Sequence, residues 1–355
     1  MKRHGNLFDQ YAHPDALLQA YRRAREEKRN SRGCFLFERN LGANIGNLHA
    51  QLLDATYAPL PVNAFWINDG RKPRLIEAPS FRDLVVQHAV YAVVGPLFDR
   101  RYIATNFACR TGLGTHAAAD WLQAAMRRAP RNAWTLHVDV RKFFYTVDRA
   151  TLAALVRRII KCPDTLRLLD LFAQRPAPTG IPIGNLMSQT FANLYLNSLD
   201  HFCKRTLGAV DYGRYMDDAV MIAPSRAVGQ DWLHRIGEHL ALLGLEISHH
   251  SLQPIARGVN WVGYRTWARA RFVRPRLVHQ IRADARHARL QPLVSRLGHA
   301  RRTASHRPLI QYITEHHHAV AHRLPKSCHA HAHVGASAAR GQRRPAPGPG
   351  ARNAA

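Results

Sequence analysis

The chain has 355 residues, of which 46% are apolar, so it is long enough to bury a sizeable core and form two or three subdomains. Its 51 Lys and Arg against 24 Asp and Glu give a net charge of +27, which indicates a polyanionic partner: nucleic acid first, an anionic membrane second. No apolar run reaches the roughly 18 residues of a membrane span, and the N-terminus lacks the apolar core of a secretion signal, so we expect a cytoplasmic protein without membrane association. Five scattered cysteines without a C-x-x-C pair indicate neither a disulfide framework nor a four-cysteine zinc site.

The first half of the chain predicts helices around a strand hairpin. In chain order, apolar periodicity predicts a helix over 14–29, strands over 64–67 and 73–76, helices over 84–98 and 116–128, and a strand over 134–140. The strand at 134–140 is rich in β-branched and aromatic residues and ends at a carboxylate. It is therefore expected to be buried and to deliver Asp139 to a site.

The second half continues with alternating helices and strands. The pattern predicts helical structure over 149–175, a Pro/Gly-rich loop over 176–180, a helix over 188–199 and strands over 210–212 and 219–223. In the helix at 188–199, Gln189, Asn193 and Asn197 recur every four residues and form a polar stripe. Taken alone, this stripe is best interpreted as a solvated face.

Beyond residue 264 the composition becomes strongly basic. Residues 265–355 hold 18 Lys and Arg against two acids, Asp284 and Glu315, and so supply +16 of the net charge. Up to about residue 323 there is enough Leu, Ile and Val for basic helices. From residue 325 onward the Ala/Gly/Pro/Arg/His mixture predicts a disordered tail.

The tetrapeptide Tyr215-Met216-Asp217-Asp218 places two adjacent carboxylates between two predicted strands, at the tip of a hairpin. Phosphoryl transfer needs two divalent ions held by carboxylates from rigid elements, and Asp139, Asp217 and Asp218 are suitable catalytic metal ligands. The alternative is a plain acidic turn. Phe144 follows five residues after Asp139, and its ring is suited to exclude a ribose 2′-hydroxyl, although a Phe143-Phe144 pair is more often part of a core.

Taken in order, these motifs resemble the reverse transcriptases over about residues 1–264. The resemblance implies that Lys72, Arg74 and Arg82 bind the triphosphate of the incoming nucleotide, as basic side chains suited to phosphate. It makes Asp139, Asp217 and Asp218 the metal ligands and Phe144 the steric gate. The segment 260–264 resembles the primer-grip hairpin, which implies primer contacts by Trp261, Gly263 and Tyr264. Where relatives carry a lysine general acid, this chain has His249-His250-Ser251, and His250 is the candidate replacement.

Within the family, the segment 180–189 resembles the enzymes of diversity-generating retroelements, which copy a template RNA with frequent errors at adenines. Ile183 and Gly184 stand where many relatives have Gln-Gly, and Gln189 follows Ser188 where many have Pro. The resemblance places Ile183, Gly184 and Gln189 in the nucleotide pocket and turns Gln189 and Asn193 toward the active site. Ile183 cannot hydrogen-bond the substrate as glutamine does, which favours looser base selection.

The resemblance implies an α/β (α+β) right-hand polymerase with fingers, a ferredoxin-like palm and a short helical thumb. The expected domains are fingers with an N-terminal extension over 1–95, a palm over 96–264 with a fingers insertion near 149–178, a thumb over 265–324 and the tail over 325–355. The expected cofactors are two Mg²⁺ ions, with Mn²⁺ as a substitute. The expected partners are template RNA, primer, cDNA, deoxynucleoside triphosphates and a small basic accessory protein.

Two alternatives stay open from the sequence. A retron-like or phage-defence reverse transcriptase would keep the fold and the chemistry, and genomic context would discriminate it, because a mutagenic retroelement needs a near-identical repeat pair. A non-catalytic RNA-binding protein would use the +27 charge alone.

Overall fold

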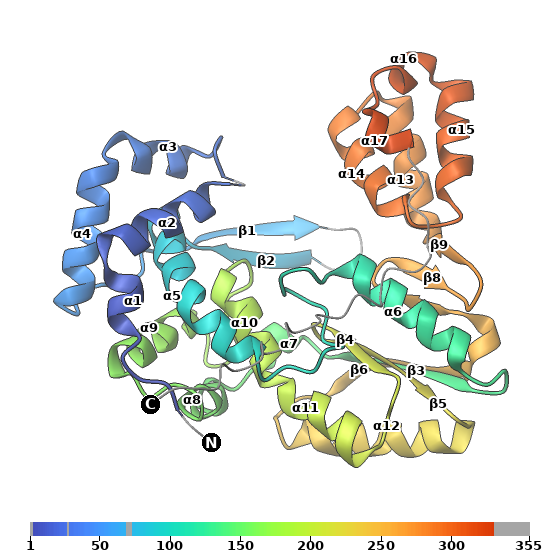
Figure 1. The fold of residues 1–355 in the computed structure, drawn as a ribbon, viewed down its shortest axis with the longest axis horizontal. Coiled ribbons are helices and arrows are strands. Elements are labelled where there is room, and N and C mark those ends of the chain that lie inside the picture. Colours follow the sequence, from blue (N-terminus) through green and yellow to red (C-terminus); the bar gives the residue numbers. More distant parts are fainter. Residues whose placement is uncertain (1–2, 27, 69–72, 330–355) are drawn as a thin grey trace, which may run out of the picture. The chain divides into compact units, whose positions relative to one another are not determined.

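The computed structural model describes residues 3–26, 28–68 and 73–329, which divide into two units, Met1–Arg269 and Ala270–Ala355 (Figure 1). Each unit is described by itself. Helices and strands alternate along the chain, so the mixed α/β class expected from the sequence is confirmed. None of the helices in the described ranges is both long and apolar enough to cross a bilayer.

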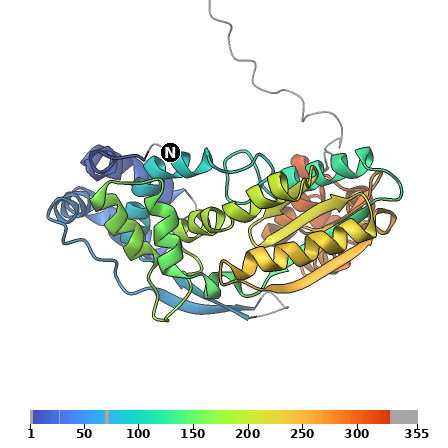
Figure 2. The same ribbon diagram turned by 90° about the horizontal axis from the view of Figure 1, so that it is seen from below.

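A four-stranded antiparallel sheet organises the first unit, with the strand order β4-β5-β3-β6. Its strands are β3 (Trp134–Val140), β4 (Tyr212–Tyr215), β5 (Asp218–Ala223) and β6 (Ile247–Pro254). Side chains alternate between the faces, so Leu136 and Val138 share one face with their cross-strand partners. The amphipathic helix α12 (Arg226–Ala241) covers this apolar face, as Figures 1 and 2 show.

The opposite face of the sheet carries a second core cluster at one end. Val220 and Ile222 pack in this cluster with Phe107, Leu122 and Trp261. These partners come from the segment before helix α6 (Thr115–Arg128), from α6 itself and from the hairpin of β7 (Val259–Trp261) and β8 (Tyr264–Thr266). The polar residues of β3 and β5 lie at the other end of this face, which positions the candidate site.

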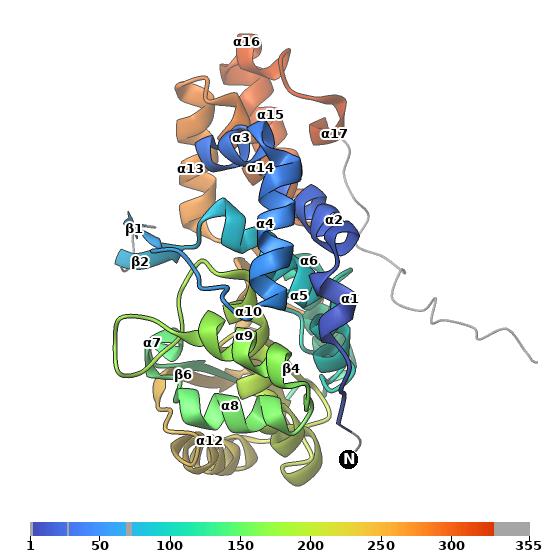
Figure 3. The same ribbon diagram turned by 90° about the vertical axis from the view of Figure 1, so that its left-hand side faces the viewer.

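The N-terminal part of the first unit is a layer of helices against a long apolar helix (Figure 3). Its elements are α1 (Phe8–Ala12), α2 (Pro14–Arg25), α3 (Arg32–Arg39), α4 (Leu41–Leu53) and α5 (Phe81–Asp99). Tyr21, Phe37 and Phe81 form an aromatic cluster with centroids 5.5 to 6.3 Å apart, which joins α2, α3 and α5. The first helix of the sequence prediction, expected to reach residue 29, ends at Arg25.

A two-stranded hairpin, β1 (Asn63–Asn68) and β2 (Pro73–Ala78), extends from this layer. Every residue of β1 is exposed, including Trp66 at 67%. Residues 69–72, which include Lys72, lie outside the described residues.

The segment between the sheet strands β3 and β4 is helical. It contains α7 (Phe143–Thr146), α8 (Arg149–Arg157), α9 (Pro163–Ala173), α10 (Leu186–Tyr195), α11 (Asn197–His201) and a π-helical turn over Phe202–Thr206. The predicted helical stretch over 149–175 is two helices, because Pro163 begins a new one at its first position. Asn185 caps α10 by accepting from the backbone N–H groups of Met187 and Ser188.

The second unit is a small bundle of basic helices that follows strand β9 (Arg271–Val273). Its helices are α13 (Pro275–Arg286), α14 (Leu290–Ala300), α15 (His306–His316), α16 (His318–Ala321) and α17 (Lys326–His329). Apolar residues such as Ile281, Leu293 and Ile313 are buried between them. The tail was expected to be disordered from residue 325, but residues 326–329 form helix α17, in which Cys328 is buried. Residues 330–355 lie outside the described part of the chain.

Candidate active site

The two carboxylates of the tetrapeptide lie where β4 turns into β5. Met216 and Asp217 form the turn, and Met216 has a φ of +57°, in the left-handed region. The N–H of Val140 donates to the Asp217 carbonyl at 3.1 Å, and Asp139 is the cross-strand partner of Asp218. The turn and the end of β3 thus bring Asp139, Asp217 and Asp218 to one end of the sheet.

The carboxylates at this end raise each other's pKa. Burial first, and then the charge of Asp139, raise the pKa of Asp217 to about 6. Burial, followed by the charge of Asp218, likewise raises the pKa of Asp139 above its ordinary value. Ionising both carboxylates here therefore costs free energy, and a bound cation would lower that cost.

Asp218 differs from the other two carboxylates because it already has a partner. Its Oδ1 pairs with Nε2 of His137, which lies two residues before Asp139 on the same face of β3. The indole N–H of Trp261 donates to the Asp218 carbonyl at 3.4 Å. His137 was not identified from the sequence, although the alternation of β3 places it on the face of Asp139.

The donor set fits a hard divalent cation such as Mg²⁺. Magnesium sites in polymerases use one or two carboxylates together with substrate phosphate oxygens, and seldom an all-protein cage. The described ranges contain no group of three or more His, Cys, Asp or Glu side chains arranged to hold a metal ion. Asp139 and Asp217 can supply the two carboxylates, and Asp218 is the third candidate.

The predicted steric gate is joined to the predicted pocket loop by backbone contacts. Phe144, on α7, is half-buried, and its carbonyl accepts from the N–H of Ile181 at 2.8 Å. Gly180 has a φ of +86°, and a Cβ there would lie 2.6 Å from the Phe144 oxygen, so only glycine lets the loop come this close. Phe144 and the 180–184 loop are therefore one local unit.

The pocket loop also contacts the hairpin that carries the predicted phosphate ligands. The N–H of Glu77, on β2, donates to the Ile183 carbonyl at 2.7 Å. Gly184 packs so closely on β2 that a Cβ would lie 2.7 Å from Cγ2 of Ile76. Gln189 is exposed on α10, one turn before Asn193, which is buried.

The three predicted triphosphate ligands differ in their surroundings. Arg74 on β2 is exposed, and its charge lowers the pKa of Asp217, which places it within electrostatic reach of the carboxylates. Arg82 instead donates to the Asp83 carboxylate at 2.9 Å and to the Ala58 carbonyl at 3.2 Å, and it stacks over the Tyr57 ring. The structure thus holds Arg82 in the helical layer, and Lys72 lies outside the described residues.

The hairpin predicted to grip the primer is anchored by its aromatic side chains. Trp261 and Tyr264 are both buried, with Trp261 edge-on to Trp121 and the Tyr264 hydroxyl 2.9 Å from His116 Nδ1. Gly263 forms the turn with a φ of +91°. The described geometry therefore gives both aromatic side chains a packing role, and primer contact by this hairpin stays a prediction.

The candidate general acid His250 lies on the opposite face of the sheet from Asp139. His250 is the cross-strand partner of Val138, whereas His249 is the partner of Asp139. Cross-strand partners share a face, so His249 lies on the carboxylate side. The register, which shifts at a bulge between Asp139 and Val140, could not be read from the sequence.

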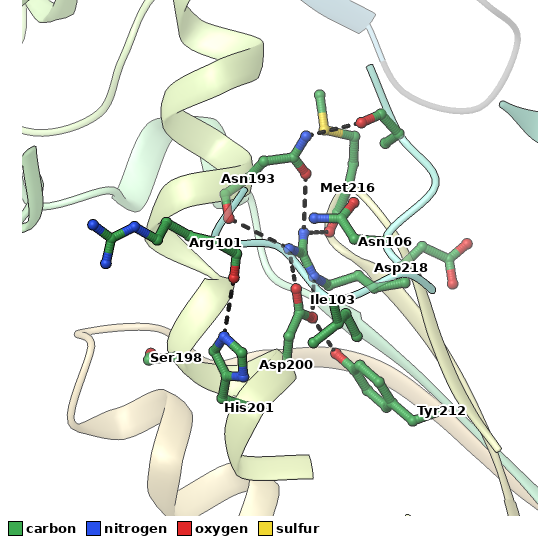
Figure 4. Close-up of polar contacts among 12 residues, drawn as sticks. Arg101, Ile103, Asn106, Asn193, Ser198, Asp200, His201, Tyr212, Met216 and Asp218 are labelled. Carbon is green, nitrogen blue, oxygen red and sulfur yellow. Dashed lines mark hydrogen bonds and ion pairs between the residues drawn. The ribbon is translucent and has the colours of Figure 1, made fainter. Parts of the chain in front are cut away.

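Arg214 is a second residue that the sequence did not single out. It is fully buried on β4 and is paired with Asp200, which is labelled in Figure 4. The sequence signal for it was a charged residue within a predicted strand region, because a charge in a buried strand needs a partner of opposite charge.

Comparison with known proteins identifies the family. Residues 68–266 match the family model described as reverse transcriptase (RNA-dependent DNA polymerase). The chain is 26% identical to protein YkfC of Escherichia coli K12 over 56% of each chain. It is also 26% identical to the group II intron-encoded protein LtrA of Lactococcus lactis, over 44% of this chain and 28% of LtrA.

The chain thus spans about half or less of the length of these curated relatives. Among solved structures, telomerase from Candida albicans in complex with a fragment of telomeric RNA has a TM-score of 0.48 and 11% identity, over 74% of this chain and 58% of that chain. Since the family match covers more than half of its residues, this chain belongs to the reverse transcriptase (RNA-dependent DNA polymerase) family, with the mixed α/β, right-hand polymerase fold expected from its sequence.

Proposed function

We propose that this protein is an RNA-directed DNA polymerase that copies a template RNA into cDNA. The observation that carries the proposal is the convergence of Asp139, Asp217 and Asp218 at one end of the sheet: Asp139 is the cross-strand partner of Asp218, and the N–H of Val140 donates to the Asp217 carbonyl at 3.1 Å. Arg74 lies within electrostatic reach of Asp217. In the reaction, the primer 3′-oxygen loses its proton and forms a bond to the α-phosphorus of a deoxynucleoside triphosphate. The bond from that phosphorus to the bridging oxygen breaks, and pyrophosphate leaves.

Each participating side chain has a separate task. Asp139 and Asp217, with Asp218 as the third candidate, would hold two Mg²⁺ ions, with Mn²⁺ as the substitute. When bound, these ions supply charge neutralisation at the attacking and leaving oxygens. Arg74 would bind the triphosphate, and the Phe144 ring would exclude a ribose 2′-hydroxyl.

Within the family, we propose the error-prone enzyme of a diversity-generating retroelement. The support is the 180–189 segment, in which Ile183 offers the substrate an aliphatic side chain on a loop joined to both Phe144 and β2. The proposal includes a small basic accessory protein as a partner and the cytoplasm as the compartment where template RNA and nucleotides meet. A retron-like role would share this chemistry and differ in genomic context.

Primer extension followed by sequencing tests both levels. Purified protein with Mg²⁺ is expected to extend oligo(dT) on poly(rA) with dTTP, and then to copy a heteropolymeric RNA. Errors in that cDNA are expected to concentrate at template adenines. Equal error rates at all four bases would remove the retroelement assignment and keep the polymerase, whereas tight RNA binding without extension would favour the non-catalytic alternative.

The two adjacent histidines give a direct test of the face that carries the proton donor. His249→Gln is expected to lower kcat for extension by at least about tenfold, because a positioned acid contributes on the order of 10²-fold or more to such a step. His250→Gln, as the matched control on the other face, is expected to stay within about twofold of the parent. A loss confined to His250→Gln would return the role to His250.

A further inference from the structure

A buried arginine, Arg214, donates a hydrogen bond to the backbone of the turn that contains Met216 and Asp217. Arg214 on β4 is 0% exposed, and its Nη1 donates to the Met216 carbonyl oxygen at 2.7 Å (Figure 4). Met216 has a φ of +57°, which a residue with a side chain adopts only when its surroundings hold it there. Asp217 is the next residue, so the group that fixes this carbonyl also sets the direction in which Asp217 is presented.

Asp200 holds the other edge of the same guanidinium. Arg214 Nε donates to Asp200 Oδ1 at 2.6 Å and Nη2 to Oδ2 at 2.7 Å, a bidentate pair. The Tyr212 hydroxyl donates to the same Oδ1 at 2.8 Å. Asp200 lies on α11 and is fully buried, so the pair is fixed to the helices beneath the sheet.

Asn193 completes the set of acceptors and links it to α10. Arg214 Nη1 donates to its side-chain oxygen, and Nη2 to its backbone oxygen, both at 3.4 Å. Its own amide donates to the Ala108 carbonyl at 2.8 Å. All five N–H donors of the guanidinium thus have an acceptor, an arrangement that a lysine with three donors cannot reproduce.

The network joins two parts of the proposed active site. Helix α10 begins at Leu186, directly after the loop that contains Ile183 and Gly184. The same arginine therefore contacts the helix of the nucleotide pocket and the turn of the metal ligands. A displacement of either element changes the hydrogen bonds of the other.

We propose that Arg214 is a positioning residue that holds the Met216 carbonyl, and with it the Asp217 carboxylate, in register with helix α10. The inference rests on the proposed polymerase function. Arg214 touches neither substrate nor metal, so its effect is expected in kcat and in the Mg²⁺ concentration that gives half-maximal rate, with little change in the KM for dTTP.

The test compares Arg214→Lys with Tyr212→Phe in extension of oligo(dT) on poly(rA). Arg214→Lys keeps a positive charge beside Asp200 but loses the contact with Met216 or Asn193. It is expected to lower kcat by roughly 10- to 100-fold and to raise the half-saturating Mg²⁺ concentration severalfold. Tyr212→Phe removes a hydrogen bond from the same Asp200 without touching the turn, and is expected to lower thermal stability with kcat within about threefold of the parent.

The possible outcomes separate the positioning role from its alternatives. Equal kinetic effects of the two variants, or a folded Arg214→Lys protein with parental kcat and Mg²⁺ dependence, would overturn the positioning role. If Arg214→Lys does not fold, Asn193→Ala serves as the second variant, since it keeps the contacts of Arg214 with Asp200 and Met216 and removes the side-chain link to helix α10. A parental kcat and Mg²⁺ dependence in this variant would overturn the proposed coupling of the turn to α10. An inactive parent would contradict the proposed function itself, which makes the two failures distinguishable.

Discussion

Replacing Asp217 by asparagine is expected to abolish primer extension and, at the same time, to stabilise the metal-free protein. The activity should fall by at least about 10³-fold, equivalent to about 4 kcal/mol of the barrier, because an amide cannot supply the charged oxygen that a divalent cation needs. The stability should rise because the pKa of Asp217 is raised to about 6 in the folded chain from an ordinary 3.8. Ionising this carboxyl at neutral pH therefore opposes folding.

The pH dependence fixes the sign of this effect. Between pH 4 and 6 the folded state binds more protons at Asp217 than the unfolded state, so its contribution to stability is lost as the pH rises through this window. Melting in EDTA should show Asp217→Asn to be more stable than the parent by roughly 3 kcal/mol at pH 7, with the difference vanishing near pH 4. A constant difference across that range would contradict the electrostatic origin.

Asp211 provides the matched control for Asp217. It lies just before β4, and its carboxylate accepts from Arg128 Nη2 at 2.9 Å. Asp211→Asn removes one carboxylate from the same region at the cost of a surface ion pair, and is expected to keep extension within about twofold. Loss of activity in both variants would indicate a general effect of charge rather than metal binding by Asp217.

The second large effect is expected in the selection of deoxyribose over ribose in the incoming nucleotide. Phe144→Ala removes a half-buried ring while leaving the backbone carbonyl that accepts from Ile181. The preference for dTTP over UTP, measured as the ratio of kcat/KM values on poly(rA), is expected to fall by roughly 10²-fold because the steric clash with the 2′-hydroxyl is lost. Phe144→Tyr keeps the ring and should keep the preference.

Phe143 separates this role from plain packing. It is buried beside Phe144, with ring centroids 5.5 Å apart. Phe143→Leu should cost stability on the order of 1 kcal/mol without changing sugar selection. If Phe144→Ala lowered the melting temperature and left the preference for dTTP unchanged, Phe144 would be a core residue and the gate would lie elsewhere.

The parts of the fold and site that the sequence could predict are those set by local pattern. The strand over 134–140 has the bounds of β3, and the helix expected over 116–128 begins one residue earlier as α6, because periodicity and β-branched content are local properties. The carboxylates were found because they stand at strand ends. Asp139 and Asp217 are then brought together by pairing between β3 and the β4–β5 hairpin, which a resemblance to a family implied but periodicity alone did not.

The features that could not be predicted depend on contacts distant in the chain. Arg82 is predicted to bind phosphate, and its contacts with Ala58 and Tyr57, more than 20 residues earlier in the chain, could not be read from its neighbours. The acceptors of Arg214 lie on α10 and α11, so the residues next to it in the sequence do not indicate that it is buried. The face of each histidine depends on a bulge that adds one residue to the register of β6.

That bulge has an evolutionary consequence. Deleting or inserting a single residue next to it would slide β6 by one position and exchange every side chain between the two faces. Because His249 and His250 are adjacent, a slip in one direction would place His250 opposite Asp139, whereas a slip in the other direction would place Ser248 there. The pair of histidines therefore keeps an imidazole on the carboxylate face for one of the two possible shifts of β6.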